Sequence, residues 1–344
     1  MIRGHGDDAY RYDRPVEVDF SSNVWHGGRR DGLCRFLSQR LDAMGSYPEP
    51  DAGGLGSRIA ARSGVPAGAV CVTSGATEAF YLVAQAFAGA DSTVPVPAFS
   101  EYADACAMHR HRVRRISREA LLRGEGLDGG GLVWLCSPNN PDGRAYPVDA
   151  LRDKIGTFRE RVFVLDHSYG AFTDAPLLDD REVLRYPNLV VVHSMTKRYG
   201  MPGLRLGYLV ASPGLVTRIA ACRMPWSVNA LALAAGKYVL SHPEEFVFDR
   251  KALLAEARRF RRRLDDIGGV ETSPSDCHFF LARLGRGTAA ALKDDLMERH
   301  GWLVRDASNF DGLSEGHFRV AAQRKEQNDR LAGMIEEWIR IFRR

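Results

Sequence analysis

The sequence predicts an α/β protein: a large domain with a mostly parallel sheet covered by helices on both faces, and a smaller α+β domain. Short apolar runs recur between segments with helical periodicity, and this alternation is typical of βαβ units. After about residue 245 the pattern changes to long amphipathic helices, such as EEFVFDRKALLAEARRFRRRLDDIG. A chain of 344 residues with 45% hydrophobic content can bury the core of both domains. We predict an N-terminal arm over residues 1–45, a large domain over 46–245 and a small domain over 246–344.

The first part of the chain contains a strand that leads directly into a helix. The arm has one short strand candidate, VEVDF. After the arm, a helix is expected over about Leu55 to Arg62, and it ends before Gly64. The segment AVCVTSGATEAF then joins an apolar strand to a long helix through the polar turn at Ser74 to Thr77. A helix start presents free backbone N–H groups to an anion, so this turn is a candidate phosphate site. An ordinary capped turn is the alternative.

Further apolar strands end in polar residues. TVPVP precedes Phe99, GLVWLC precedes a turn that contains Asn140, and VFVL precedes Asp166 and Tyr169. LVVV precedes the polar stretch that contains Lys197. Right-handed crossovers place the carboxyl ends of such strands on one edge of a parallel sheet, where open α/β folds bind their ligands. The sequence therefore predicts one shared site at that edge.

The stretch HSMTKRYGMPGLRLGY carries the strongest chemical signal in the chain. A lysine held near cations and partly out of water loses its proton more easily, and a neutral amine can attack a carbonyl group to form a Schiff base. The hydroxyls of Ser194 and Thr196 and the guanidinium of Arg205 suit a phosphate group, and the glycines let the backbone approach closely. Lys197 is thus a candidate for binding a phosphorylated carbonyl cofactor. A solvated surface lysine is the alternative.

Composition and charge argue against several classes of protein. The 47 basic and 43 acidic residues are spread along the chain, so no nucleic-acid partner is expected. One basic tract, HRHRVRR, is expected on a solvated face near a helix end. The six cysteines never form C-x-x-C and are expected as free thiols, which favours a reducing compartment. With a polar N-terminus and no long apolar stretch, we expect a cytoplasmic protein without membrane association, and we predict no metal site.

Three motifs occur in a fixed order along the chain. P-N-N-P-x-G comes first, D-x-x-Y second, and S-x-T-K-x-x-G-x-x-G-x-R-x-G-Y third. In this order they resemble the motifs of the fold-type I, pyridoxal-phosphate-dependent aminotransferase family of class I/II. The resemblance implies pyridoxal 5′-phosphate as the cofactor, with its aldehyde on Lys197 and its phosphate held by Ser194 and Arg205. It also implies that Asp166 faces the pyridine nitrogen and keeps it protonated.

Further positions take their roles from the same chemistry. Tyr169 and Asn140 would both reach the phenolic oxygen of the ring, and Phe99 would cover its face, with a core aromatic as the alternative for Phe99. Without the resemblance, Asp166 would be read as a turn residue and Tyr169 as a core tyrosine. Arg319 lies in the strand-like segment HFRVA, where an arginine is unexpected unless it has a partner. The resemblance makes Arg319 the residue that binds the α-carboxylate of the substrate bidentately.

Two branches of the family compete: the histidinol-phosphate aminotransferases and the threonine-phosphate decarboxylases of cobalamin synthesis. R-G-H-G followed by D-F-S, P-A-F-S-E-Y and M-P-W-S-V-N-A-L-A look more like the decarboxylases. By that likeness His5, Asn23 and Arg305 gather around a substrate phosphate. Tyr47 would reach the cofactor phosphate of a neighbouring subunit, which implies a homodimer to which the arm contributes. Glu315 departs from the likeness, because a carboxylate repels a phosphate where the decarboxylases tend to place a lysine.

The expected function is therefore that of an L-threonine-O-3-phosphate decarboxylase-like lyase, with a transferase, histidinol-phosphate:2-oxoglutarate aminotransferase, as the alternative. A cofactor-sensing transcription factor on the same fold is a further alternative, although those proteins carry an added helix-turn-helix domain. A Ser/His/Asp hydrolase using Ser168 or Ser194 with His167 or His193 lacks the G-x-S-x-G motif. Lys197, Asp166 and Tyr169 are the predicted catalytic residues. The full set of candidate site residues is His5, Asn23, Tyr47, Gly75, Ala76, Thr77, Phe99, Asn140, Asp166, Tyr169, Ser194, Thr196, Lys197, Arg205, Arg305 and Arg319.

Overall fold

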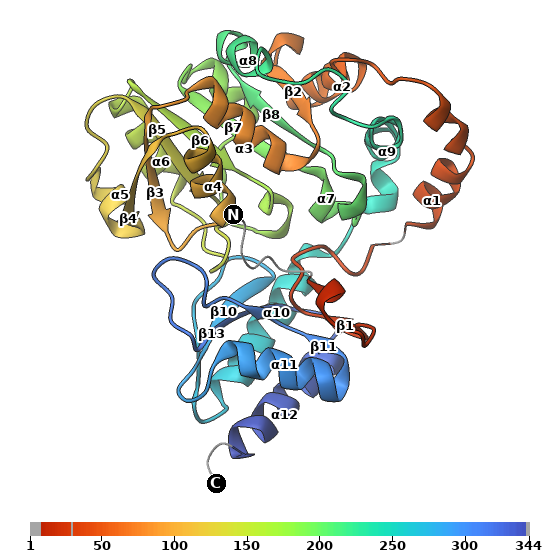
Figure 1. Cartoon of the computed structure of the whole chain (residues 1–344), viewed down its shortest axis with the longest axis vertical. Helices are drawn as coiled ribbons and strands as arrows, with labels where there is room; N and C mark the ends of the chain where they lie inside the picture. The colour runs from red at the N-terminus through yellow and green to blue at the C-terminus, as the bar shows by residue number, and fades with distance from the viewer. Residues whose placement is uncertain (1–7, 29, 342–344) are drawn as a thin grey trace.

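A computed structural model describes residues 8–28 and 30–341 of the chain. The upper part of the molecule in Figure 1 is built on a seven-stranded sheet with the order β2-β8-β7-β6-β5-β3-β4. β8 runs antiparallel to both of its neighbours and the other pairs are parallel, so the predicted mostly parallel sheet is confirmed. The strands of this sheet are β2 (Val70–Thr73), β3 (Asp91–Val96), β4 (Arg112–Ser117), β5 (Gly131–Cys136), β6 (Arg161–Asp166), β7 (Leu189–Ser194) and β8 (Gly207–Ala211).

Helices cover both faces of this sheet. Val133 and Leu135 of β5 pack in one core and Leu132 and Trp134 in the other, because successive side chains of a strand point to opposite faces. The first core includes residues of α2, α5, α6 and α9, and the second includes residues of α3, α4 and α8. The bounds are α2 (Gly53–Ser63), α3 (Gly75–Ala86), α4 (Ser100–Met108), α5 (Arg118–Arg123), α6 (Val148–Thr157), α8 (Pro213–Ala220) and α9 (Ala230–Ser241).

The lower part of the molecule in Figure 1 has its own sheet and its own core. Four antiparallel strands lie in the order β12-β13-β10-β9, and α10, α11 and α12 contribute apolar residues to the core beside them. The N-terminal arm joins this part, because β1 pairs in parallel with β11. The bounds are β1 (Val18–Asp19), β9 (Val270–Thr272), β10 (Phe279–Leu284), β11 (Trp302–Leu303), β12 (Arg305–Asp306), β13 (His317–Ala321), α10 (Arg250–Asp265), α11 (Ala289–His300) and α12 (Lys325–Ile341).

Two short helices complete the elements that matter for the site. α1 (Asp31–Ser38) packs on α9, and α7 (Met195–Arg198) follows β7 directly. Of the helices in the described part of the chain, none combines the length and the apolar character needed to cross a lipid bilayer.

One local prediction differs from the structure, and another is confirmed. The charged helix predicted from Glu244 begins only at Arg250, because Asp249 caps it by accepting a hydrogen bond from the Ala252 N–H at 2.9 Å. The basic tract HRHRVRR begins where α4 ends, at Met108, and continues into the exposed edge strand β4, so it lies on a solvated face near a helix end as predicted. Arg112 of this tract pairs with Asp91 on β3. A row of charged side chains on an edge strand discourages pairing with another chain.

Candidate active site

A cavity of about 470 Å³ opens at the carboxyl ends of β5, β6 and β7, at the edge of the sheet where the sequence predicts a shared site. The start of α3, the arm segment Ser21 to Val24 and Arg319 on β13 complete its walls. Most of the predicted site residues meet in this one place. Those that line the cavity are Asn23, Gly75, Ala76, Thr77, Phe99, Asn140, Asp166, Tyr169, Ser194, Thr196, Lys197, Arg205 and Arg319.

Three predicted residues are not among the lining residues. Tyr47 is 86% exposed and lies at the surface of its own chain. Arg305 is buried opposite Arg319 in the antiparallel β12–β13 pair, and its guanidinium donates to Asn309 Oδ1 at 2.7 Å. His5 lies outside the described residues. Arg305 therefore lies beside Arg319, on the neighbouring strand, without lining the cavity itself.

The structure also answers two questions that the sequence raises. Glu315 is exposed in the turn before β13 and does not line the cavity, so its carboxylate does not oppose a phosphate there. Nε2 of His193 is 2.7 Å from Asp180, and Oγ of Ser194 is 2.7 Å from Oγ1 of Thr196. The serine and the histidine are thus directed to different partners, and these residues do not form a hydrolase triad.

An anion cradle forms where β2 leads into α3. Gly75 adopts a φ of +80°, and a Cβ on it would lie 2.7 Å from a guanidinium nitrogen of Arg205, so this arginine lies against the start of the helix. Gly207 of β8 packs on the same turn, because a Cβ there would lie 2.5 Å from the backbone nitrogen of Ala76. The hydroxyls of Ser194 and Thr196 line the cavity nearby. Backbone N–H groups, hydroxyls and a guanidinium together suit a phosphate.

Asp166 is a buried carboxylate held from two sides. The Tyr102 hydroxyl donates to Oδ2 at 2.6 Å and the Ser168 N–H donates to Oδ1 at 2.8 Å. Burial raises the pKa of Asp166, and the hydrogen bonds from Ser168 and Tyr102 only partly oppose this effect. A cation facing this carboxylate from the cavity would stabilise its ionised form.

Tyr102 is the main site residue that the sequence analysis missed. Its ring stacks on Trp134 at 6.0 Å and meets Phe80 edge-on at 4.9 Å, so the hydroxyl is fixed in direction. It lies on the first turn of α4, three positions after Phe99, on the same side of that turn. This spacing within P-A-F-S-E-Y is the signal that would have identified it.

Arg319 and Asn23 bring polar groups to the opposite wall. Arg319 donates to the Ser21 carbonyl at 2.5 Å and also to Asn140 Oδ1. Among the described residues, Arg319 Nε and both amide atoms of Asn23 are buried without a hydrogen-bond partner. Such groups are rare in folded proteins unless a ligand or water satisfies them. This wall is therefore suited to an anionic, hydrogen-bonding ligand.

Replacing Tyr102 with phenylalanine is expected to reduce kcat/KM by about ten-fold, the cost of one hydrogen bond to a charged group. The ring packing stays, but the bond that favours the ionised form of Asp166 is lost. The pKa of Asp166 then rises, so the acid limb of the kcat/KM profile should move to higher pH. The pH profile of the variant measures this shift, and an unmoved acid limb would contradict a positioning role.

Acid should destabilise the protein through two buried histidines. Burial lowers the pKa of His167 and of His278 from 6.5 to about 3. The unfolded chain therefore takes up protons as the pH falls through 6.5 while the folded chain does not, and the stability present above pH 6.5 is lost progressively. Between pH 7 and pH 5 we expect a loss of about 2 kcal/mol per histidine. Urea unfolding should show a weaker pH dependence for His167→Gln, and an unchanged dependence would refute the explanation.

The site combines a lysine after one strand of an open α/β sheet, a buried carboxylate at the end of the neighbouring strand, and an anion cradle at a helix start. This combination defines a fold-type I enzyme of the pyridoxal-phosphate-dependent class. The chain belongs to the aminotransferase class I and II family, whose model matches residues 37–335. The predicted family, the predicted enzymatic nature and pyridoxal 5′-phosphate as the cofactor are thereby confirmed.

Individual relatives come from both predicted branches. The chain is 31% identical to the threonine-phosphate decarboxylase of Salmonella typhimurium over 338 residues, which cover 92% of this chain and 90% of the relative. It is 33% identical to the histidinol-phosphate aminotransferase of Symbiobacterium thermophilum over 308 residues, covering 85% and 82% of the two chains. The crystal structure of L-threonine-O-3-phosphate decarboxylase from Porphyromonas gingivalis matches with a TM-score of 0.92 and 40% identity, over 94% of this chain and 99% of that chain.

Proposed function

We propose that this enzyme decarboxylates L-threonine O-3-phosphate or a close analogue. The observation that carries the proposal is the pairing of two buried arginines, Arg305 and Arg319, across β12 and β13 beside the cavity. This substrate has two anionic groups, a carboxylate and a phosphate, whereas histidinol phosphate has no carboxylate. The likeness to the Porphyromonas gingivalis decarboxylase, at 40% identity, supports the same choice.

The cavity residues fit the cofactor of the family. Burial raises the pKa of Asp166, so a cation beside it is needed to favour the carboxylate form. A protonated pyridine nitrogen would be such a cation. Ser194, Thr196 and Arg205, with the start of α3, would hold the phosphate, and Lys197 would hold the aldehyde carbon. When bound, the cofactor supplies a sink for the electron pair left on the substrate α-carbon after one of its bonds breaks.

Other residues orient the ring and the substrate. Asn140 and Tyr169 would hydrogen-bond the phenolic oxygen of the ring, and Phe99 would cover its face. Arg319 would bind the substrate carboxylate and so orient the substrate. This orientation sets which bond at the α-carbon stands perpendicular to the ring and therefore breaks. Lys197 would then return a proton to the α-carbon that has lost the carboxylate.

The second arginine accounts for the phosphate of the substrate. Burial and, after it, the neighbouring Arg319 lower the pKa of Arg305 to about 10. A dianion beside the two guanidiniums would offset their mutual repulsion. We assign the substrate phosphate to Arg305, with the unsatisfied amide of Asn23 and with His5 as further partners.

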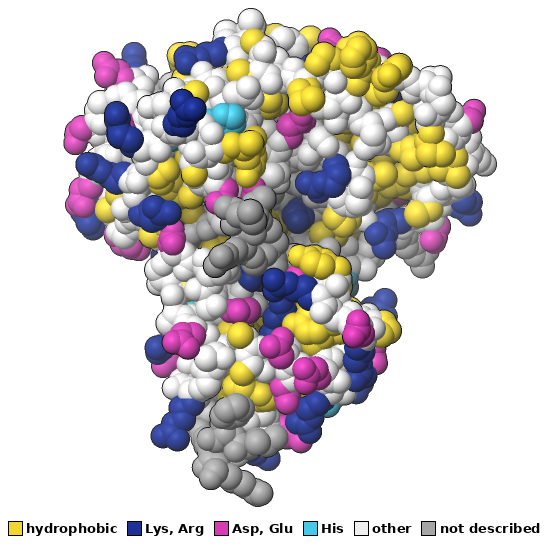
Figure 2. Space-filling view, viewed as in Figure 1, with side chains coloured by type: hydrophobic (Ala, Val, Ile, Leu, Met, Phe, Trp, Pro, Cys, Tyr) yellow, Lys and Arg dark blue, Asp and Glu magenta, His cyan; other side chains and the backbone are white. Residues whose placement is uncertain are grey.

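A homodimer is part of this proposal. Tyr47 packs on Trp226 with ring centroids 5.3 Å apart, and both are exposed together with Met44 and Met224. Figure 2 shows hydrophobic side chains gathered over α1 and α9, where an apolar groove also lies. An exposed apolar surface of this kind suits a second copy of the chain, in which Tyr47 would reach the cofactor phosphate of the partner.

We also propose the domain limits and the location that the sequence predicts. The large domain, over 46–245, would hold the seven-stranded sheet, and the small domain, over 246–344, would hold the four-stranded sheet with the core beside it. The arm, over 1–45, would contribute to the small domain through β1, which pairs with β11. The six cysteines are free thiols, which supports a reducing compartment such as the cytoplasm. No nucleic-acid partner is part of the proposal.

The test uses purified enzyme loaded with pyridoxal phosphate and mixed with O-phospho-L-threonine. Release of carbon dioxide, with the visible absorbance of the cofactor regained after each turnover, is the expected result. Arg305→Gln should raise the KM for the phosphorylated substrate strongly while the visible absorbance of the loaded enzyme stays normal. A normal KM in that variant would contradict the phosphate assignment.

The alternative function is that of an aminotransferase, which the relative from Symbiobacterium thermophilum favours. Histidinol phosphate with 2-oxoglutarate, run alongside, tests it. Amino-group transfer without carbon dioxide release would overturn the decarboxylase proposal and leave the family assignment intact.

A further inference from the structure

A second cavity of about 690 Å³ adjoins the first and is the larger of the two. Its walls come from the end of α2, the start of α7, β8 and the 3-10 helix η5 (Asp180–Leu184). Ser168 and Ser194 line both cavities, so only the segments that follow β6 and β7 separate them. None of the roles proposed above uses this second cavity.

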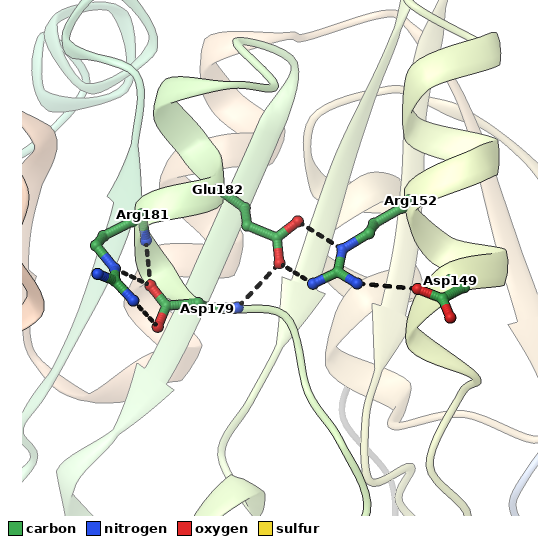
Figure 3. A network of polar contacts seen from close by, with 5 residues as sticks. All are labelled: Asp149, Arg152, Asp179, Arg181 and Glu182. Carbon is green, nitrogen blue, oxygen red and sulfur yellow. Dashed lines mark hydrogen bonds and ion pairs between the residues drawn. The ribbon is translucent and has the colours of Figure 1, made fainter.

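The carboxylates in this cavity already have partners. Asp180 accepts from the Ser63 hydroxyl at 2.7 Å and lies 2.7 Å from His193 Nε2. Asp179 accepts two bonds from the Arg181 side chain, as Figure 3 shows. The same figure shows η5 tied to α6 through Glu182, which accepts bonds at 2.9 and 2.8 Å from Arg152. The acceptors are therefore satisfied and fixed in place.

Several donors in the cavity have no such partner. Within the described residues, neither Arg62 nor Arg198 forms an ion pair or donates a hydrogen bond, and Arg198 Nε is buried and unsatisfied. The Tyr208 hydroxyl likewise has no hydrogen-bond partner in that part of the chain. Buried His167, which packs edge-on against His193, has an unsatisfied Nε2.

These donors line the same cavity although they come from three elements. Arg62 lies in the last turn of α2, Arg198 ends α7, and Tyr208 lies on β8. Both guanidiniums act electrostatically on the Tyr208 phenol, where they oppose the rise in its pKa that burial causes. Two guanidiniums and a hydroxyl around one space form a site for an anion with several oxygens.

One part of the remaining wall is apolar. Leu177, Leu178 and Leu240 line the cavity with the ring of Tyr199. A volume of about 690 Å³ exceeds what a bare inorganic anion needs and suits an organic body attached to the anionic group. The ligand class is thus an organic phosphate or carboxylate with an apolar part.

We propose that this second cavity binds a small organic anion, whose phosphate or carboxylate is held by Arg62, Arg198 and Tyr208. A ligand there would touch Ser168, whose N–H holds Asp166, and Ser194 of the cofactor cradle. The site is distinct from the substrate site and does not depend on which reaction the enzyme catalyses.

Calorimetric titration of the cofactor-loaded enzyme with phenyl phosphate and with benzoate tests the proposal. Both probes carry the same ring, so the tighter one identifies the preferred anionic group. We expect saturable binding of at least one probe, weakened at least about ten-fold in the double variant R62Q/R198Q, since each lost contact is a charge-assisted hydrogen bond. Arg58→Gln, one turn earlier on α2 and outside the cavity, is the matched control and should bind as the wild type does.

Tyr208→Phe provides a milder test in case the double variant folds poorly. The ring of Tyr208 stacks on His193 at 4.7 Å, and phenylalanine keeps this packing while removing only the hydroxyl. A several-fold weaker affinity is expected, with the visible absorbance of the cofactor unchanged. The absence of saturable binding by either probe, or equal affinities in the wild type and in these variants, would overturn the proposal.

Discussion

Alanine in place of Lys197 is expected to lower kcat by at least roughly 10⁴-fold, because one amine both holds the cofactor and moves the proton in the proposed mechanism. Lys197 lines the cavity on the short helix α7, directly after the polar end of β7. Its removal leaves the cofactor without a covalent attachment, so the visible absorbance of the lysine-bound form should disappear as well. Single-turnover kinetics and absorbance spectra of the same sample measure both effects.

Lys251→Ala is the matched control for this change. Lys251 is exposed on α10, outside the cavity, so its replacement should leave turnover and absorbance as in the wild type. Unchanged thermal unfolding in both variants would exclude a loss of fold as the cause. Substantial activity in Lys197→Ala would mean that another group carries the chemistry, and the assignment of Lys197 would be wrong.

The buried strands could be predicted because each is a continuous apolar run. The run GLVWLC predicts a strand with the bounds that β5 has, since both faces of this strand are covered and its residues can be apolar. The shortest strands carry no such signal. β11 and β12 have two residues each, and they exist because distant segments, Val18 for β11 and Arg319 for β12, pair with them.

The site also contains residues that a local sequence pattern predicts and contacts that no such pattern predicts. Asn140, Asp166 and Lys197 follow apolar strands, and the parallel sheet brings strand ends together without further information. Contacts made by backbone groups carry no residue signal, as with the Ser168 N–H on Asp166 and the Ser21 carbonyl on Arg319. The second cavity could not be predicted from the sequence, because its donors come from elements that only tertiary packing brings together.

The protonation state of Asp166 depends on burial and on two hydrogen bonds that also fix the orientation of its carboxyl group. Burial alone would favour the neutral acid, while Tyr102 and the Ser168 N–H favour the carboxylate. The balance leaves a group whose ionised form is best stabilised by a cation in the cavity. A protonated pyridine nitrogen facing Asp166 would strengthen this pair, because the opposite charge lowers the pKa of the carboxyl again.

Asparagine in place of Asp166 is therefore expected to lower kcat by roughly 10³-fold with little loss of stability. The amide has the same shape and its oxygen can still accept from the Ser168 N–H, but it has no charge to keep the ring nitrogen protonated. Steady-state kinetics at saturating cofactor measures the effect. Asp174→Asn is the control, because Asp174 pairs with Arg250 at the surface, and it should change kcat little. If Asp166→Asn worked nearly as well as the wild type, the negative charge would be unnecessary, and the electron sink would have to operate with a neutral ring nitrogen.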